Sequence, residues 1–205
     1  MAKRTVHIVD DEAPVRRSLA LMLKVSGYAV STFESGLALL DAAEALVPGA
    51  LLLDVRMPDM DGIQVQKQLA SRGVALPVVI MTGHGDLSVA ASALKAGAVA
   101  CLEKPFGKAV LIGALDTVFL KIENPEAYER RQFAAAARVH ALDDEERALL
   151  VRLARGRSNE EIAAELAMSG AACEVRRVRL FAKLGVENTS GALSMASAAG
   201  LQPSD

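Results

Sequence analysis

The feature that most constrains the fold is a regular alternation of short apolar segments with longer amphipathic ones. The apolar segments occupy residues 5–9, 28–33, 50–53, 78–81 and 99–102. Helical spacing of apolar residues follows each of them, over residues 14–26, 36–46, 63–71, 87–96 and 106–122. Runs such as LLL and VVIM are apolar on both faces, as strands covered by helices on both sides must be. The pattern predicts an α/β fold with a five-stranded parallel sheet and right-handed crossovers.

The alternation ends at Asn124-Pro125, because proline lacks an amide donor and disfavours helix at the preceding residue. Polar and alanine-rich residues follow and predict a helical linker over 126–141. Beyond it no strand pattern remains, and we predict helices over 143–154, 160–167, 171–184 and 190–199. The chain is therefore expected to form an α/β domain over residues 1–123, a linker over 124–141 and an all-α domain over 142–205.

Several classes of protein are excluded by the composition. The first apolar run is short and is followed by three acids, so the N-terminus predicts neither a secretory signal nor a membrane span. The two cysteines, Cys101 and Cys173, lie far apart without metal-ligand spacing, which argues against a disulfide framework or a zinc site. We expect a cytoplasmic protein with no membrane partner, and its net charge of −2 does not by itself indicate nucleic-acid binding.

Acidic residues stand where two of the predicted strands end. A flavodoxin-like sheet of order 2-1-3-4-5 binds ligands at the carboxyl ends of its strands, where the order reverses between strands one and three. The first strand ends in Asp10 and Asp11, and the third ends in Asp54. Carboxylates held this close repel one another, so either some are protonated or a cation neutralises them. Oxygen ligands alone favour Mg²⁺ over zinc, so we predict a magnesium site.

With a cation present, Asp54 can attack a phosphoryl donor and form an aspartyl phosphate. Thr82 ends the fourth strand and Lys104 follows the fifth, so a hydroxyl and an ammonium reach the same crevice and can bind phosphoryl oxygens. Each residue alone has a structural alternative: Asp11 could cap the next helix, and Lys104 could be a solvated strand end. Their joint placement at the strand ends favours a phosphoacceptor site.

The motifs HIVDDE, LLLDVRMPDMDG, VVIMTGHGD and LEKPF together resemble the receiver domain of two-component response regulators. TGHGD and EKPF are similar to the FixJ branch in particular. The resemblance implies that Asp54 is phosphorylated by a partner sensor histidine kinase. It also implies that Mg²⁺ is held by Asp10, Asp11, Asp54 and the backbone carbonyl of Arg56.

The same resemblance implies that Thr82 turns toward the phosphoryl group and that the Lys104-Pro105 bond is cis. One position departs from the family pattern. Cys101 stands three residues before the lysine, where the family usually has Phe or Tyr that moves with the threonine. We expect Cys101 to be a small buried residue of the fifth strand.

Phosphorylation adds about 1.5 to 2 negative charges to the crevice and biases a two-state equilibrium. We expect the helix over 87–96 and the strand after it to form the surface that reports this change, with Leu87, Ala91, Leu94 and Lys95. We expect a homodimer to form there on phosphorylation. Ordinary core packing is the alternative for Ala91 and Leu94.

The segment SNEEIAAELAMSGAACEVRRVRLFAKLGV resembles the FixJ/NarL class of LuxR-type helix-turn-helix domains, over residues 142–201. In that class the second helix enters the major groove of DNA and the last helix assists dimerisation. A helical wheel places Cys173, Arg177, Leu180 and Leu184 on a core stripe. The predicted DNA-binding residues lie outside that stripe: Glu174, Val175, Arg176, Val178, Arg179 and Lys183.

Two outputs stay open for this helix-turn-helix. The first is a transcription regulator, not an enzyme, that binds promoter DNA under control of phosphorylation. The second is a response regulator whose degenerate helix-turn-helix signals through protein contacts, because Gly170, Ala171 and Ala172 replace the family's usual phosphate-contacting residues. From residue 138 onward nine Arg or Lys face ten Asp or Glu, a balance of −1 where a DNA-binding domain is usually basic. A haloacid-dehalogenase-like phosphatase is set aside, since Arg56 stands where that class needs an aspartate.

Overall fold

The computed structural model describes residues 3–83 and 86–201 and contains one parallel sheet. Its strands are β1 (Thr5–Val9), β2 (Ala29–Phe33), β3 (Ala50–Asp54), β4 (Val78–Thr82) and β5 (Ala100–Glu103). They pair in the order β2-β1-β3-β4-β5, and every neighbouring pair is parallel. The predicted flavodoxin-like sheet is confirmed, and its switch point lies between β1 and β3.

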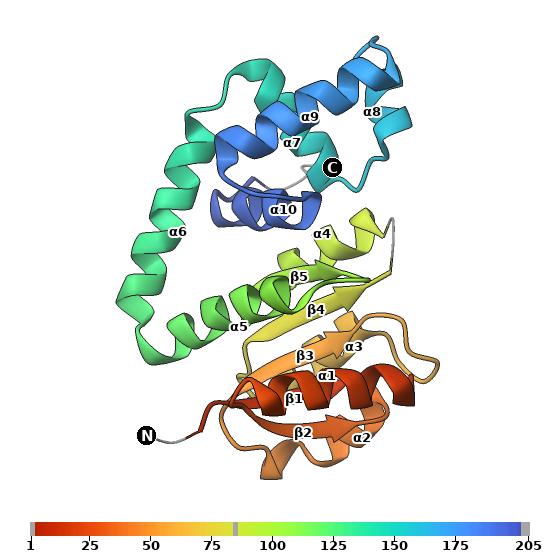
Figure 1. Ribbon diagram of the computed structural model, residues 1–205, viewed down its shortest axis with the longest axis vertical. Coiled ribbons are helices and arrows are strands. Elements are labelled where there is room, and N and C mark those ends of the chain that lie inside the picture. Colours follow the sequence, from red (N-terminus) through yellow and green to blue (C-terminus); the bar gives the residue numbers. More distant parts are fainter. Residues whose placement is uncertain (1–2, 84–85, 202–205) are drawn as a thin grey trace.

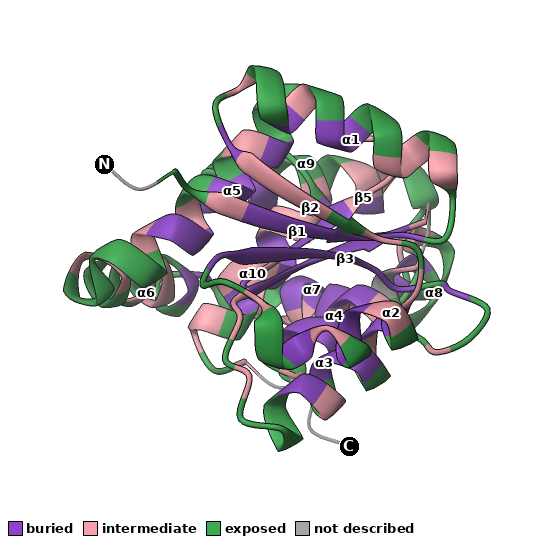
Figure 2. Cartoon of the chain, turned by 90° about the horizontal axis from the view of Figure 1, so that it is seen from below, coloured by how far each residue is buried: buried purple, intermediate pink, exposed green. Residues whose placement is uncertain are grey.

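Helices cover both faces of the sheet (Figure 2). On one face lie α1 (Ala13–Val25) and α5 (Lys108–Glu123), and on the other α2 (Gly36–Asp41), α3 (Gly62–Ser71) and α4 (Leu87–Lys95). Because successive strand residues point to opposite faces, each strand supplies both layers. Ile8 and Leu52 pack in the cluster with α1 and α5, whereas Leu51 and Leu53 pack in the cluster of the opposite face.

The remaining helices form a separate bundle: α7 (Asp144–Ala154), α8 (Asn159–Glu165), α9 (Gly170–Leu184) and α10 (Thr189–Ala198). Their starts are fixed by local capping. Asp143 and Ser158 each accept a hydrogen bond from the amide three residues on, and a glutamate closes the capping box in both cases. The predicted linker helix is α6 (Pro125–His140), which runs along one side of the molecule from α5 to the bundle (Figure 1).

Two predicted helices end early. The helix expected over 36–46 stops at Asp41 and continues as a 3-10 turn, η1 (Ala43–Ala45), since the chain must become extended before Pro48. The helix expected over 160–167 stops at Glu165, because Ala167 takes a left-handed conformation with φ 51°. Neither change moves a predicted site residue. None of the helices in the described ranges is long and apolar enough to cross a bilayer.

The bundle rests on one edge of the α/β layer. α10 lies against α4 and β5 (Figure 1), and a single cluster of buried residues runs from that face of the sheet into the interior of the bundle. Leu193 and Ala196 of α10 are buried, as is Leu94 of α4. The two halves therefore share a packed apolar contact in addition to α6.

Candidate functional site

The sheet register brings the predicted residues to one edge. Asp54 pairs with Met81 on β4, and Thr82 pairs with Glu103 on β5, so the last residues of three strands stand level. The Lys104 amide donates a hydrogen bond to the Thr82 carbonyl over 2.8 Å. Lys104 therefore stays paired with the end of β4 although it lies one residue beyond β5. The Lys104-Pro105 peptide bond is cis, as predicted.

An ammonium joins two buried carboxylates in this crevice. Lys104 Nζ lies 2.5 Å from Asp54 Oδ1 and 2.8 Å from Asp10 Oδ2, and the two aspartates are 5% and 0% exposed. Asp10 also accepts a hydrogen bond from the Glu12 amide. Two carboxylates and one ammonium leave an excess negative charge in a region nearly closed to water.

Burial raises the pKa of the Asp54 carboxyl, and this outweighs the hydrogen bond and charge of Lys104, which act in the opposite direction. Burial by itself lowers the pKa of the Lys104 ammonium, but the hydrogen bonds with Asp10 and Asp54 raise it overall. Burial disfavours the charge on both groups, and the two carboxylates share a single ammonium. The crevice therefore favours an additional positive charge.

The expected gathering of three carboxylates is seen only in part. Asp11 is exposed, and its carbonyl, like that of Asp10, accepts a hydrogen bond from the Arg16 guanidinium. Within residues 3–83 and 86–201 no three acidic, histidine or cysteine side chains lie close enough together to hold a metal ion. The ammonium of Lys104, placed between Asp10 and Asp54, supplies the nearest positive charge instead. The oxygen donors and their excess charge nevertheless fit a hard cation such as Mg²⁺.

Two further groups border the crevice. Thr82 is buried, and its hydroxyl finds no hydrogen-bond partner within the described part of the chain. The Arg56 amide donates to the Asp54 carboxylate, while the Arg56 guanidinium forms an ion pair with Asp86 at the start of α4. No pattern along the chain indicates this pair, because it joins loops that are 30 residues apart.

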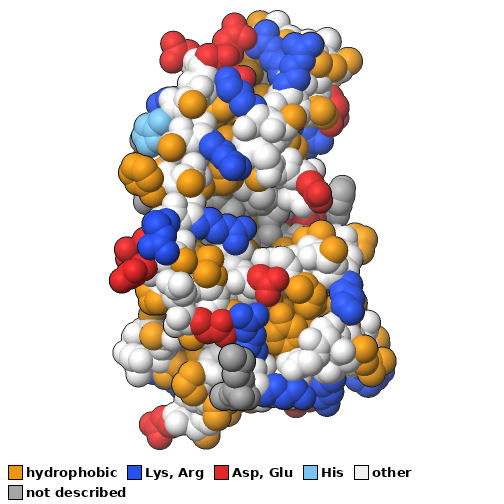
Figure 3. Space-filling model, turned by 60° about the vertical axis from the view of Figure 1, so that its left-hand side comes forward, with side chains coloured by type: hydrophobic (Ala, Val, Ile, Leu, Met, Phe, Trp, Pro, Cys, Tyr) orange, Lys and Arg blue, Asp and Glu red, His pale blue; other side chains and the backbone are white. Residues whose placement is uncertain are grey.

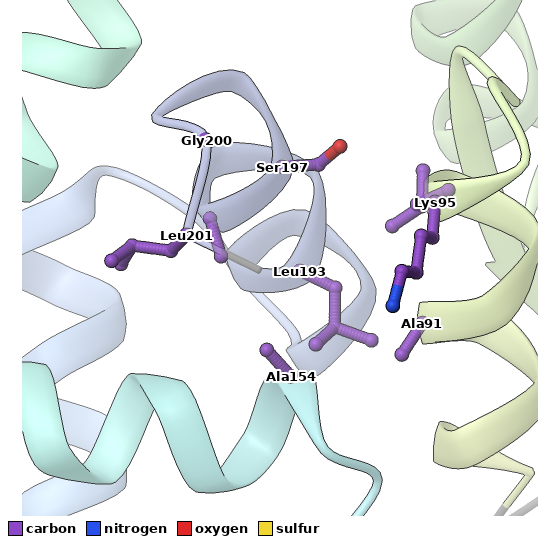
Figure 4. A pocket seen from close by; sticks show the side chains of 9 residues that line it. Ala91, Lys95, Ala154, Leu193, Ser197, Gly200 and Leu201 are labelled. Carbon is purple, nitrogen blue, oxygen red and sulfur yellow. The ribbon is translucent and has the colours of Figure 1, made fainter. Parts of the chain in front are cut away.

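The predicted dimerisation surface is covered within the same chain. Leu94 is buried, and Ala91, Leu94 and Lys95 line a pocket whose other wall is α10. Leu193 of α10 points toward Ala91 across this pocket (Figure 4). The Leu87 side chain lies outside the described residues. The surface expected to meet a second copy thus meets α10 instead.

α9 presents one buried and one exposed face. Cys173, Leu180 and Leu184 are buried in the bundle, which confirms the predicted core stripe at these positions. Val175 and Val178 are 51% and 58% exposed. Two branched apolar side chains held in water on a helix of this bundle are available for contact with another molecule.

Glu174 turns toward the bundle. Its carboxylate accepts hydrogen bonds from Asn159 Nδ2 over 3.0 Å and from Arg177 over 2.9 Å. The Arg177 guanidinium also lies 5.5 Å from the centre of the Phe181 ring. Arg177 is thereby anchored on the core stripe, as the helical wheel predicted, and Glu174 orients it.

Two of the three predicted α9 cations are paired with acids at the start of α7. Arg176 lies 2.6 Å from Glu145, and Lys183 lies 2.5 Å from Glu146. Arg179 lines a shallow pocket with the same acids. Acidic and basic side chains stand next to one another at this end of the molecule in the space-filling view (Figure 3). The surface that would meet phosphates is therefore partly neutralised by the chain itself.

Comparison with known proteins agrees with both halves of the chain. The response regulator receiver domain matches residues 6–116, and the bacterial regulatory proteins of the luxR family match residues 140–196. Transcriptional regulatory protein FixJ of Rhizobium meliloti is 39% identical over 204 residues, covering 100% of both chains, and that of Azorhizobium caulinodans is 37% identical, covering 98% of this chain and 95% of its own.

Among solved structures, full-length FixJ from B. japonicum is similar with a TM-score of 0.59 and 35% identity, covering 98% of this chain and 99% of its own. The response regulator StyR is similar with a TM-score of 0.55 and 33% identity, covering 95% of this chain and 98% of its own.

A parallel α/β domain with an acidic crevice, joined to a helix-turn-helix bundle, defines a response regulator with a LuxR-type DNA-binding domain. The chain belongs to the FixJ/NarL family of these transcription regulators.

Proposed function

We propose that Asp54 is the phosphoacceptor of a two-component system and receives its phosphoryl group from a sensor histidine kinase. The observation that carries this is the placement of Lys104 against both Asp54 and Asp10 at the end of the sheet. A carboxylate attacks a phosphoryl donor only where the donor's charge is neutralised. Lys104 provides one such charge, and the Thr82 hydroxyl, which has no hydrogen bond of its own within the described residues, can donate to a phosphoryl oxygen.

Mg²⁺ would be held by Asp10, Asp11, Asp54 and the backbone carbonyl of Arg56, and when bound it neutralises phosphoryl oxygens. Residues of this chain orient the reacting carboxylate and keep water away from it. Lys104 orients the Asp54 carboxylate toward the crevice, and the surrounding β-sheet excludes water from it. The domain limits we propose are a receiver over 1–123, a linker over 124–141 and an effector over 142–205, all in the cytoplasm.

The output is control of transcription through a homodimer that binds promoter DNA. Val175 and Val178 would contact base methyl groups, and Arg179 with the paired cations Arg176 and Lys183 would contact phosphates. A second candidate output is docking to a protein, favoured by the acids of α7 that already occupy two of the cations.

One experiment tests phosphoacceptance and output together. The protein and Asp54→Asn are incubated with Mg²⁺ and a small acyl-phosphate donor, and mass and binding to promoter fragments are measured at several salt concentrations. Uptake of one phosphoryl group by the parent only, with tighter binding and a steep salt slope, supports the proposal. Uptake without DNA affinity supports protein docking, and no uptake overturns the phosphoacceptor role.

A further inference from the structure

The loop between β1 and α1 carries Asp10 and Asp11, and one side chain fastens it to α1. Arg16 lies in the first turn of α1, and a single nitrogen of its guanidinium makes two hydrogen bonds. That nitrogen donates to the Asp10 carbonyl over 2.6 Å and to the Asp11 carbonyl over 2.8 Å. The Arg16 amide donates to the Glu12 carbonyl over 3.0 Å. Arg16 therefore holds the loop through both its backbone and its side chain.

The two loop carbonyls depend on this guanidinium. Within the described residues no backbone amide donates to the carbonyl of Asp10 or to that of Asp11. The hydrogen bond to Asp10 is partly shielded from water, and Arg16 itself is half-buried. A shielded carbonyl that loses its donor is unfavourable, so the loop would have to change its conformation to regain a hydrogen bond from water.

The loop directs its two carboxylates differently. The Asp10 carboxylate points into the crevice, 2.8 Å from Lys104 Nζ, and accepts a hydrogen bond from the Glu12 amide over 2.9 Å. Asp11, the next residue, is exposed. Because Arg16 holds the peptide groups on both sides of the Asp11 α-carbon, the backbone of Asp11 is fixed and only its side-chain torsions are free. The loop therefore needs no rebuilding before both carboxylates can serve one ion, which preorganises the site.

From this geometry we infer that Arg16 is a positioning residue for the Mg²⁺ site of the crevice. The inference rests on the proposed function, which assigns Asp10 and Asp11 to the ion. The Arg16 guanidinium binds the loop backbone and acts on the ion only through the two carboxylates that the loop presents. Groups that orient metal ligands through hydrogen bonds commonly contribute about 10–100-fold to metal affinity.

The sign of the effect separates this role from simple electrostatics. Arg16 is a positive charge beside a site for a cation, so its charge by itself repels the ion. If charge alone mattered, removing the guanidinium would tighten Mg²⁺ binding. If Arg16 positions the loop, removing the guanidinium weakens binding instead. Charge and positioning therefore predict opposite changes in the same measured affinity.

Arg17 provides a matched control on the same helix. It lines the same pocket as Arg16 and is exposed, and within the described residues its side chain makes no hydrogen bond or ion pair. Arg17→Met thus removes an equal charge from α1 without loosening the loop. Arg16→Lys keeps the charge. Because one nitrogen atom makes both hydrogen bonds of Arg16, a lysine ammonium can replace it in part.

The experiment follows binding of Mn²⁺ by the EPR signal of the free ion and obtains Mg²⁺ affinity by competition, since both ions take carboxylate and water ligands. We expect Arg16→Met to bind Mg²⁺ about 10–100-fold more weakly than the parent. Arg17→Met should bind as tightly as the parent or slightly more tightly. The affinity of Arg16→Lys should lie between those of the parent and Arg16→Met.

Thermal unfolding in EDTA measures the structural cost of each variant separately. Equal Mg²⁺ affinity in the parent and Arg16→Met, or tighter binding in Arg16→Met, overturns the positioning role even where Tm falls. Asp54→Asn locates the ion, because binding in the crevice should weaken when that carboxylate is lost. A parent that binds no ion, or binding that Asp54→Asn leaves unchanged, overturns the proposed Mg²⁺ site together with this inference. Phosphoryl uptake, followed by mass, tests the phosphoacceptor role independently.

Discussion

Asp10, Asp54 and Lys104 form a buried charge cluster. Replacing Asp54 and replacing Lys104 should change the free energy of unfolding in opposite directions. Asp54→Asn removes an attraction, to Lys104, and a smaller repulsion, from Asp10, but burial of the carboxylate outweighs both, since it raises the Asp54 pKa. In the parent, burying a carboxylate that is 5% exposed costs several kcal/mol of desolvation. In the variant, burying an amide at the same position costs about 1–3 kcal/mol. We expect Asp54→Asn to be about 1–2 kcal/mol more stable at neutral pH without divalent ions, which raises Tm by about 2–8 °C.

Lys104→Met should have the opposite effect. It leaves Asp10 and Asp54 buried without a cation, and breaking such a pair costs about 3–5 kcal/mol when fully buried. The Lys104 side chain is about one quarter exposed, so we expect about 2–4 kcal/mol of destabilisation. Asp11→Asn is the matched control, because its carboxylate is exposed, and it should stay within about 0.5 kcal/mol of the parent.

The pH dependence follows from the raised pKa of Asp54. A carboxyl whose pKa is higher in the folded than in the unfolded state adds stability at low pH, and this is lost as pH rises through the folded value. The advantage of Asp54→Asn over the parent should therefore shrink as pH falls toward about 4. Calorimetry in EDTA and in Mg²⁺ measures all three variants, and Mg²⁺ should narrow the gap by stabilising the parent. A parent more stable than Asp54→Asn in EDTA would refute the charge argument.

Three other predictions concern the bundle, the core and the thiols. Glu145→Gln with Glu146→Gln frees the two paired cations of α9, and the salt slope of DNA binding should steepen by about one to two units in titrations of promoter fragments. Leu150→Ala opens a cavity in the interior of the bundle and should cost about 2–5 kcal/mol in urea unfolding. Alkylation of Cys101 in the resting protein should keep rising with pH up to its pKa of about 12, and a profile that levels off near pH 8.5 would contradict its burial.

The crevice was predictable because it depends on local patterns. Apolar runs locate the strands. Because the strands are parallel, Asp10 and Asp54 come to the same edge of the sheet, whatever the exact positions of the helices. The contacts of Ser190 with Cys101 and of Arg176 with Glu145 have no such pattern. The first depends on how the two halves rest on one another, and the second on how α7 packs against α9. No periodicity along the chain encodes either arrangement.

The length of α6 sets the reach of the tether between the receiver and the bundle. Its 16 residues form a rod of about 24 Å, with a non-helical residue, Asn124, as a pivot at its start. A tether this short keeps the two halves at a high local concentration, so their contact with one another outcompetes encounters with other molecules at cellular dilution.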